Sequence, residues 1–367
     1  MSGPIFVTRP YLPSLAEFIP MLEDIWASRI LTNHGPFHQR FEQRLGTVLD
    51  ADHVSLVANG MLALTAAIDA CDIMGEVITT PYSFVATTHA VAMGRLTPVF
   101  VDIRPDDLNI DPLRIEAAIT RRTQAIVAVH VYGNPCDVDA IEDIARRHDL
   151  KVIYDAAHAF GVRYRGKALA SFGDFATLSF HATKAFNTFE GGAVISATAA
   201  SKQRIHRSSN FGIADEVTIP AIGSNAKMSE FNAALGLLQL DHFEQVRRDR
   251  ARVDGRYREL LAGIDGIDCL AVPHEVEPNF SYFPIFVRPN FRVRRDALYE
   301  ELKAHEICSR RYFYPLLSTL PMYRDLPSAT PANLPVATEA AGQILCLPIY
   351  GGLAEADQDR IVEAVRG

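Results

Sequence analysis

Three side chains that could do joint chemistry follow strand-like runs near the middle of the chain. Asp155 ends the apolar run Val152 to Tyr154, and Ser179 and Lys184 bracket the segment Ser-Phe-His-Ala-Thr-Lys. A pyridoxal phosphate site needs an amine that can form a Schiff base, a carboxylate that keeps the pyridine nitrogen protonated, and donors for the phosphate. The spacing therefore predicts pyridoxal 5'-phosphate as cofactor, with Lys184 and Asp155 as catalytic residues and Ser179 on the phosphate.

Each of these residues has a structural alternative. Most lysines are solvated surface charges, and an acid at a strand end is often a turn former or helix cap. For Lys184 the Schiff-base role is favoured over a surface position by the paired glycines Gly191 and Gly192, which let the backbone approach a ligand closely. For Asp155 the cofactor site is favoured by the apolar run, because a desolvated carboxylate at the carboxyl end of a strand needs a cationic partner. His158 would contact the ring oxygen or orient Asp155, with a structural histidine as the alternative.

Two further segments supply candidate cofactor contacts. Asn59 and Gly60 precede the apolar segment Met61 to Leu64, so a glycine turn opens a predicted helix. The free N–H groups and the dipole at such a start favour an anion, which makes Gly60 and Met61 candidate phosphate ligands and an ordinary helix cap the alternative. Phe84 is expected to stack on the pyridine face, although an aromatic beside a strand end is more often core.

Composition limits the class of protein. The chain has 367 residues, 48% of them hydrophobic, which predicts two domains with packed interiors. With 36 basic against 44 acidic residues and no basic block, we expect neither nucleic acid nor a membrane as partner. The five cysteines form no CxxC pair, so we expect no metal site and no disulfide framework. Since no signal-like start or membrane-length apolar run is visible, we expect a soluble cytoplasmic protein.

The pattern of elements indicates an α/β protein with a largely parallel sheet. Short apolar runs alternate with helical patterns between about residues 50 and 200. The predicted strands are 77–80, 98–103, 125–132, 151–155, 177–180 and 193–196, and the predicted helices are 62–72, 85–93, 112–120 and 138–148. A long helix, 229–261, leads to a smaller α+β part with a strand at 282–287, helices at 294–305 and after 353, and a proline-rich loop at 315–335. We expect a large domain with an N-terminal arm over 1–240 and a small domain over 241–367.

Taken together, the motifs resemble the DegT/DnrJ/EryC1/StrS family of sugar aminotransferases, nearly from end to end. The segments that carry the resemblance are 9–13, 31–36, 59–60, 81–87, 155–158, 179–184, 223–228 and 233–240. The resemblance implies the pyridoxal-phosphate-dependent transferase fold of type I. That fold has a mostly parallel seven-stranded sheet flanked by helices, with a smaller α+β C-terminal domain.

The resemblance also implies an activity and an assembly. Lys184 would be both cofactor anchor and general acid/base. The cofactor would first take the amino group from L-glutamate, which leaves as 2-oxoglutarate, and would then pass it to a keto group on a nucleotide-linked deoxysugar. The protein would be a homodimer with shared active sites, in which Asn225 reaches the cofactor phosphate of the neighbouring subunit.

The chain departs from the family pattern at three places. Met61 stands where many members have a threonine that helps hold the phosphate. Lys227 stands where an arginine is frequent, and a lysine cannot reproduce the planar two-point grip on a carboxylate. A histidine often found after the segment containing Arg311 and Tyr312 is missing. We expect Lys227, Arg311 and Tyr312 to contact donor or sugar, with a plain surface arginine as the alternative for Arg311.

Within the family, segments 11–13, 31–36, 180–184 and 311–315 look most like enzymes that aminate dTDP-4-keto-6-deoxy-D-glucose. The product would be dTDP-4-amino-4,6-dideoxy-D-glucose, a precursor for O-antigen or other surface glycans. Amination of a 3-keto carbon or of a UDP-sugar is the alternative. A relative that dehydrates the sugar would carry histidine in place of Lys184. A non-catalytic regulatory protein would have lost Asp155, Ser179 or Lys184. A cysteine-dependent enzyme would need a reactive thiol, for which Cys308 is the candidate.

Overall fold

A seven-stranded sheet forms the centre of the larger part of the molecule. The computed structural model describes residues 3–367, and the strand order of this sheet is β1-β9-β8-β5-β4-β2-β3. The strands are β1 (Val54–Val57), β2 (Glu76–Thr79), β3 (Thr97–Phe100), β4 (Thr123–Val129), β5 (Lys151–Asp155), β8 (Phe175–Ser179) and β9 (Gly192–Ser196). β9 runs antiparallel to both its neighbours, whereas β8, β5, β4, β2 and β3 pair in parallel. The predicted α/β class with a largely parallel sheet is confirmed.

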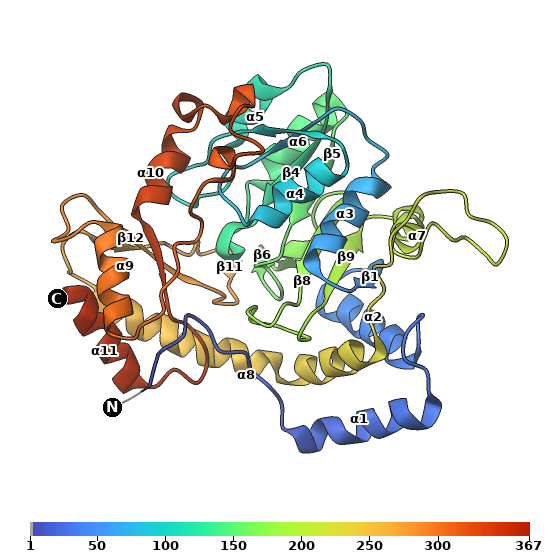
Figure 1. The fold of residues 1–367 in the computed structure, drawn as a ribbon, viewed down its shortest axis with the longest axis horizontal. Helices are drawn as coiled ribbons and strands as arrows, with labels where there is room; N and C mark the ends of the chain where they lie inside the picture. Colours follow the sequence, from blue (N-terminus) through green and yellow to red (C-terminus); the bar gives the residue numbers. More distant parts are fainter. Residues whose placement is uncertain (1–2) are drawn as a thin grey trace.

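Helices connect and cover these strands (Figure 1). They are α3 (Gly60–Ala70), α4 (Val85–Met93), α5 (Pro112–Ala118), α6 (Val138–His148) and α7 (Ala199–Ser208). In α6, Asp137 caps the N-terminus through the Ala140 N–H, while Val138, Ile141 and Ile144 are buried. A polar cap followed by apolar residues at helical spacing buries one face on the sheet, which is why this helix ran from Val138 to His148 as predicted.

The long helix α8 (Glu230–Leu261) links the two parts of the molecule and passes beneath both (Figure 1). Its first half packs against α2 (Pro36–Val48), and α1 (Leu15–Ser28) lies alongside. Gly236 permits this close packing, because a Cβ there would lie 2.4 Å from the ring of Phe41. The domain boundary expected at residue 240 falls inside this continuous helix and stays a prediction.

The second part of the molecule has its own sheet and core. β10 (Ile267–Cys269), β12 (Phe283–Val287) and β13 (Ile344–Leu347) form an antiparallel sheet. α9 (Arg295–Ala304) and α11 (Glu355–Arg366) pack with it around a separate apolar cluster, which also includes Ile5 from the N-terminal segment. The remaining elements are α10 (Pro335–Gln343) and a small sheet of β6 (Arg163–Tyr164), β7 (Lys167–Ala168) and β11 (Val276–Glu277).

Two predicted strands extend three residues beyond the observed carboxyl ends. β4 ends at Val129, where the prediction continued to Tyr132, because Val131 to Gly133 form a turn in which Tyr132 adopts φ 57°. β3 ends at Phe100 rather than Ile103. In both cases apolar residues continue past the strand into buried loops, so hydrophobicity alone does not mark the end. Within residues 3–367, no helix combines the length and apolar character needed to cross a membrane.

Candidate active site

A cavity of about 480 Å³ opens at the carboxyl ends of β5 and β8. Its volume lies within the range of small-molecule and cofactor sites, and its position is where open α/β sheets bind ligands. Eight of the predicted site residues line it: Gly60, Met61, Phe84, Asp155, His158, Ser179, Lys184 and Tyr312. The topology therefore gathers residues from five separate segments of the sequence around one cavity.

Asp155 is the last residue of β5 and presents a buried carboxylate to the cavity. Its Oδ2 accepts a hydrogen bond from the Thr87 hydroxyl at 2.7 Å, and its Oδ1 accepts one from the Ala157 N–H at 3.1 Å. Burial raises the pKa of this carboxyl, while these hydrogen bonds and the Lys184 charge oppose the rise. The carboxylate is fixed in direction but retains lone pairs for a cation in the cavity.

Thr87 extends this support to the start of α4. Its hydroxyl lies 2.9 Å from the hydroxyl of Ser83, and both residues are buried. The chain of contacts from Ser83 through Thr87 to Asp155 fixes the carboxylate against a rigid helix. The sequence carried no signal for Thr87 beyond its place in a family-like segment, since a threonine in an apolar helix is usually packing.

Lys184 lies in the turn that follows β8, with its amine directed into the cavity. Its Nζ donates a hydrogen bond to the Tyr282 hydroxyl at 3.2 Å and lies 5.7 Å from the centre of that ring. Burial lowers the pKa of Lys184 from 10.5 to about 8, and the nearby charge of Asp155 limits the drop. Near neutral pH a useful fraction of the amine is therefore unprotonated, as a nucleophile and proton carrier requires.

Tyr282 comes from the smaller part of the molecule and closes one wall of the cavity. It lies just before β12, and its ring packs edge-on against His158 at 4.9 Å and against Tyr312 at 5.6 Å. The sequence offered only a strand-like segment at this position. A partner for Lys184 was not foreseen, because the contact joins residues 98 positions apart.

The start of α3 forms a cradle suited to an anion. Asn59 caps this helix by accepting from the Leu62 N–H at 2.9 Å, which leaves other first-turn N–H groups without an intrahelical partner. A Cβ at Gly60 would lie 2.7 Å from the Cβ of Ser179 and 3.1 Å from its hydroxyl. Only glycine therefore lets the helix start lie against Ser179, where N–H groups and a hydroxyl converge.

Phe84 and His158 both border the cavity, but His158 does not orient Asp155. Phe84 precedes α4 and borders the cavity with 57% of its surface exposed, so its ring is free to cover a planar ligand. The Nδ1 atom of His158 accepts from the Tyr132 N–H at 3.3 Å, and its ring stacks on Phe313. The orienting role considered for His158 toward Asp155 is instead filled by Thr87 and Ala157.

Three predicted residues lie elsewhere in the single chain. Lys227 donates hydrogen bonds to Asn225 at 2.7 Å and to Asn210 at 3.1 Å, beside a different pocket. Arg311 forms an ion pair with Asp296 at 2.9 Å and lies over the ring of Tyr299. Within residues 3–367, neither these two cations nor Asn225 borders the cavity that holds Lys184.

The cavity fits pyridoxal phosphate on three independent grounds. Lys184 offers an amine of lowered pKa, Asp155 a buried carboxylate with room for a cation, and Gly60 with Ser179 an anion cradle that an added methyl group would fill. The spacing of these groups is set by two strand ends and one helix start, which are rigid parts of the fold.

Comparisons with known proteins agree with this geometry. Residues 14–366 match the model of the DegT/DnrJ/EryC1/StrS aminotransferase family. A dTDP-4-amino-4,6-dideoxy-D-glucose transaminase from Escherichia coli is 51% identical over 362 residues, which is 98% of each chain. The structure of DesI with its TDP-sugar product superposes with a TM-score of 0.95 at 37% identity, covering 100% of this chain and 93% of the other. The PLP form of Spr1654 from Streptococcus pneumoniae superposes with a TM-score of 0.91 at 25% identity, covering 99% and 98%.

Proposed function

The chain belongs to the DegT/DnrJ/EryC1/StrS aminotransferase family, and from that premise we propose that it converts dTDP-4-keto-6-deoxy-D-glucose to dTDP-4-amino-4,6-dideoxy-D-glucose. Pyridoxal 5'-phosphate is the proposed cofactor and L-glutamate the proposed amino donor. The observation that carries the chemistry is the meeting of the Lys184 amine and the Asp155 carboxylate in one cavity beside an anion cradle. The 51% identity to the E. coli transaminase supports the choice of sugar.

Five residues that line the cavity have proposed tasks toward the cofactor. Pyridoxal phosphate, when bound, supplies an electron sink that stabilises the negative charge left when a proton leaves the donor's α carbon. Asp155 holds the proton on the ring nitrogen, and Phe84 covers a ring face. Gly60, Met61 and Ser179 bind the phosphate, the first two through backbone N–H groups at the start of α3.

Lys184 carries the proton during amino transfer. As a neutral amine it accepts a proton from the donor, and as an ammonium group it returns one to the aminated carbon. The lowered pKa, about 8, keeps both protonation states accessible near neutral pH. Tyr282 holds the amine within the cavity between these steps through its hydroxyl.

The proposed active unit is a homodimer. Large apolar side chains are exposed on the N-terminal arm and on the loop between α7 and α8, which extends away from the body of the molecule (Figure 1). They include Trp26 and Leu31 on the arm, and Val217, Ile219 and Ile222 on the loop. Exposed apolar surface of this kind favours association. Asn225 at the end of this loop is proposed to reach the phosphate of the partner's cofactor.

Lys227, Arg311 and Tyr312 remain proposed substrate contacts. Tyr312 lines the cavity itself, whereas Lys227 would enter the partner's site together with Asn225. Arg311 would have to leave Asp296 to meet a carboxylate or diphosphate. The proposed role of the product is in O-antigen or other surface glycan synthesis, in the cytoplasm, where the five free cysteines would remain reduced.

The test is the visible spectrum of the purified protein mixed with pyridoxal phosphate, before and after L-glutamate and then the sugar. The proposal expects a band from the bound cofactor, its loss with L-glutamate, and its return with dTDP-4-keto-6-deoxy-D-glucose. Return only with a 3-keto sugar or a UDP-sugar would keep the aminotransferase and replace the substrate. If no cofactor band is seen, the protein does not bind pyridoxal phosphate and the proposed aminotransferase activity is wrong.

A further inference from the structure

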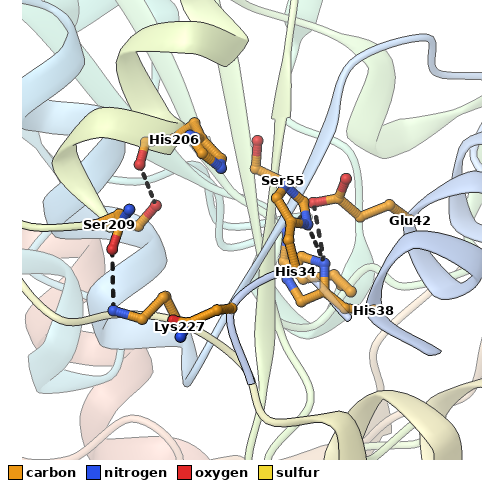
Figure 2. Close-up of a pocket in the computed structure, with 10 residues that line it drawn as sticks. His34, His38, Glu42, Ser55, His206, Ser209 and Lys227 are labelled. Carbon is orange, nitrogen blue, oxygen red and sulfur yellow. Dashed lines mark hydrogen bonds and ion pairs between the residues drawn. The ribbon is translucent and has the colours of Figure 1, made fainter. Parts of the chain in front are cut away.

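A second cluster of chemically active side chains lies outside the cavity that holds Lys184. His34, His38 and Glu42 converge at the start of α2, beside a pocket of about 170 Å³ that is also bordered by His206 and Lys227. Figure 2 shows the two histidines and the glutamate directed toward one another on one side of this pocket, with His206 and Lys227 across from them. His34, His38 and Glu42 have no task in the proposed amino-transfer chemistry, whereas Lys227, which also borders this pocket, is a proposed substrate contact in the partner's site.

The separations within the cluster are close to those between the ligands of one metal ion. The Nδ1 atoms of His34 and His38 lie 2.8 Å apart, and the Nδ1 of His38 lies 3.9 Å from Oε1 of Glu42. One atom from each residue lies within 4.8 Å of the others. These values bracket the roughly 3.3 Å between ligand atoms around a tetrahedral zinc ion with bonds of about 2.0 Å. Small side-chain rotations would bring all three to bonding distance.

The surrounding backbone holds the two histidines in place without using their facing nitrogens. His38 lies in the first turn of α2, and Glu230 anchors that turn by accepting from the N–H groups of Phe37 and His38 at 2.8 and 2.9 Å. His34 precedes the helix, and its carbonyl accepts from the Gln39 side chain at 2.7 Å. The ring of His206 stacks on the ring of His34, with centres 4.9 Å apart. The backbone of both residues and the ring of His34 are therefore held by neighbouring side chains.

Glu42 completes the set one helical turn after His38. Its carboxylate is largely buried, with Oε1 accepting from the Leu56 N–H at 3.0 Å and Oε2 lying 3.4 Å from Nζ of Lys202. A carboxylate has about four acceptor sites, so these contacts orient it and leave capacity for a metal. Such second contacts on a ligating group are typical of metal sites.

We propose that His34, His38 and Glu42 bind one divalent transition-metal ion, of which zinc is the best fit, with the remaining position open to the pocket. Two imidazoles and one carboxylate suit zinc, and closely related ions follow the usual affinity order. The ion would tie the 31–36 segment to α2 and replace the proton that the two facing nitrogens must otherwise share. No metal site was predicted from the sequence because the cysteines form no CxxC pair. That reason does not apply to this set, which contains no cysteine.

The experiment uses zinc alone as probe, on tag-free full-length protein treated with a chelator and then dialysed. Isothermal titration and metal analysis should give one zinc ion per chain. His34→Gln and Glu42→Gln should each weaken zinc binding at least about tenfold, because each removes one of three protein ligands. Zinc should also raise the thermal midpoint of the wild type more than that of either variant, since a ligand that binds only the folded state stabilises it.

A matched control is His242→Gln, in which a partly exposed imidazole that pairs with Glu17 at 2.9 Å is removed from an ordinary histidine-carboxylate contact. It should leave zinc binding unchanged. The proposal is overturned if the wild type binds no zinc, if both cluster variants bind it as tightly as the wild type, or if the control loses as much affinity. Circular dichroism of the metal-free variants checks that each remains folded; His34 is partly exposed, which favours a folded His34→Gln protein.

Discussion

The hydroxyl of Tyr282 lies 3.2 Å from Nζ of Lys184, and the two residues adjoin strands of different sheets. Lys184 follows β8 of the seven-stranded sheet, whereas Tyr282 precedes β12 of the smaller antiparallel sheet. The catalytic amine is thus positioned by packing between the two parts of the chain, and its environment depends on their alignment.

Tyr282→Phe should keep the ring contacts and remove the hydroxyl that accepts from Lys184. Losing this acceptor disfavours the ammonium form, so the pKa of Lys184 should fall further below 10.5. We expect kcat to fall about tenfold, which corresponds to one hydrogen bond, with a smaller change in KM. Tyr323→Phe is the control, because its hydroxyl contacts His89 away from the cavity. Equal kcat values and pH profiles for Tyr282→Phe and wild type would contradict the positioning role.

The amine of Lys184 should titrate well below an ordinary lysine. Since burial lowers its pKa to about 8, its neutral fraction should rise through pH 8 and level off above it. In cofactor-free protein, acylation of Lys184 followed by peptide mass spectrometry should show this midpoint, well below the value of about 10.4 for an unperturbed lysine side chain in a model peptide. The unfolded chain binds more protons between pH 8 and 10.5, so this residue's contribution to stability should rise with pH across that window. A midpoint of Lys184 at the ordinary lysine value would contradict the lowered pKa of the buried amine.

Lys184→Ala should abolish turnover and leave the fold intact, because the nucleophile and the proton carrier disappear together. Asp155→Asn should lower kcat by about 10² to 10⁴, since an amide cannot hold the ring nitrogen protonated.

Thr87→Val removes one hydrogen bond to the Asp155 carboxylate and should lower kcat about tenfold. Thr88→Val is the matched control: within residues 3–367 its buried hydroxyl has no hydrogen-bond partner, so its loss should be harmless. Steady-state kinetics with glutamate and the sugar, together with circular dichroism, would decide among these outcomes.

Gly60→Ala should block cofactor binding. The added Cβ would lie 2.7 Å from the Cβ of Ser179 and push the start of α3 away from the cradle. We expect the dissociation constant of pyridoxal phosphate to rise at least about tenfold by fluorescence titration, because several phosphate contacts shift together. Gly255→Ala in α8 meets open space and should stabilise the fold by about 0.5–1 kcal/mol. If Gly60→Ala binds pyridoxal phosphate as tightly as the wild type, the phosphate does not bind at the start of α3.

Mixed dimers should reveal whether active sites are shared. Lys184→Ala and Asn225→Asp should each be nearly inactive, but a dimer with one chain of each type contains one site with both native residues. Random mixing after unfolding and refolding should restore about a quarter of wild-type activity, because half the dimers are mixed and each has one complete site. No recovery on mixing, with dimers verified by light scattering, would place Asn225 and Lys184 of one chain in the same site. Wild-type activity of Asn225→Asp alone would show that Asn225 has no role.

The sequence alone determined the residue types and the local elements. Asp155 at the end of an apolar run, Gly60 at a helix start and Lys184 after a strand were readable because strand ends and helix starts depend on neighbours in sequence. α4 and α6 were predicted with the bounds that the structure shows, and in α6 the reason is that Val138, Ile141 and Ile144 recur at helical spacing. The family resemblance supplied the order of these motifs, and the matching residues 14–366 confirm it.

Tertiary structure decided which side chains meet. Tyr282 reaches Lys184 across 98 positions, and Thr87 reaches Asp155 across 68. The cluster of His34 and His38 also depends on the stacking of His206 from a distant helix. No local pattern encodes such contacts, because they are set by how helices and sheets pack once hydrophobic surfaces are buried. The catalytic residues could therefore be predicted from the sequence. The groups that hold the amine of Lys184 and the carboxylate of Asp155 in position were determined only by the fold.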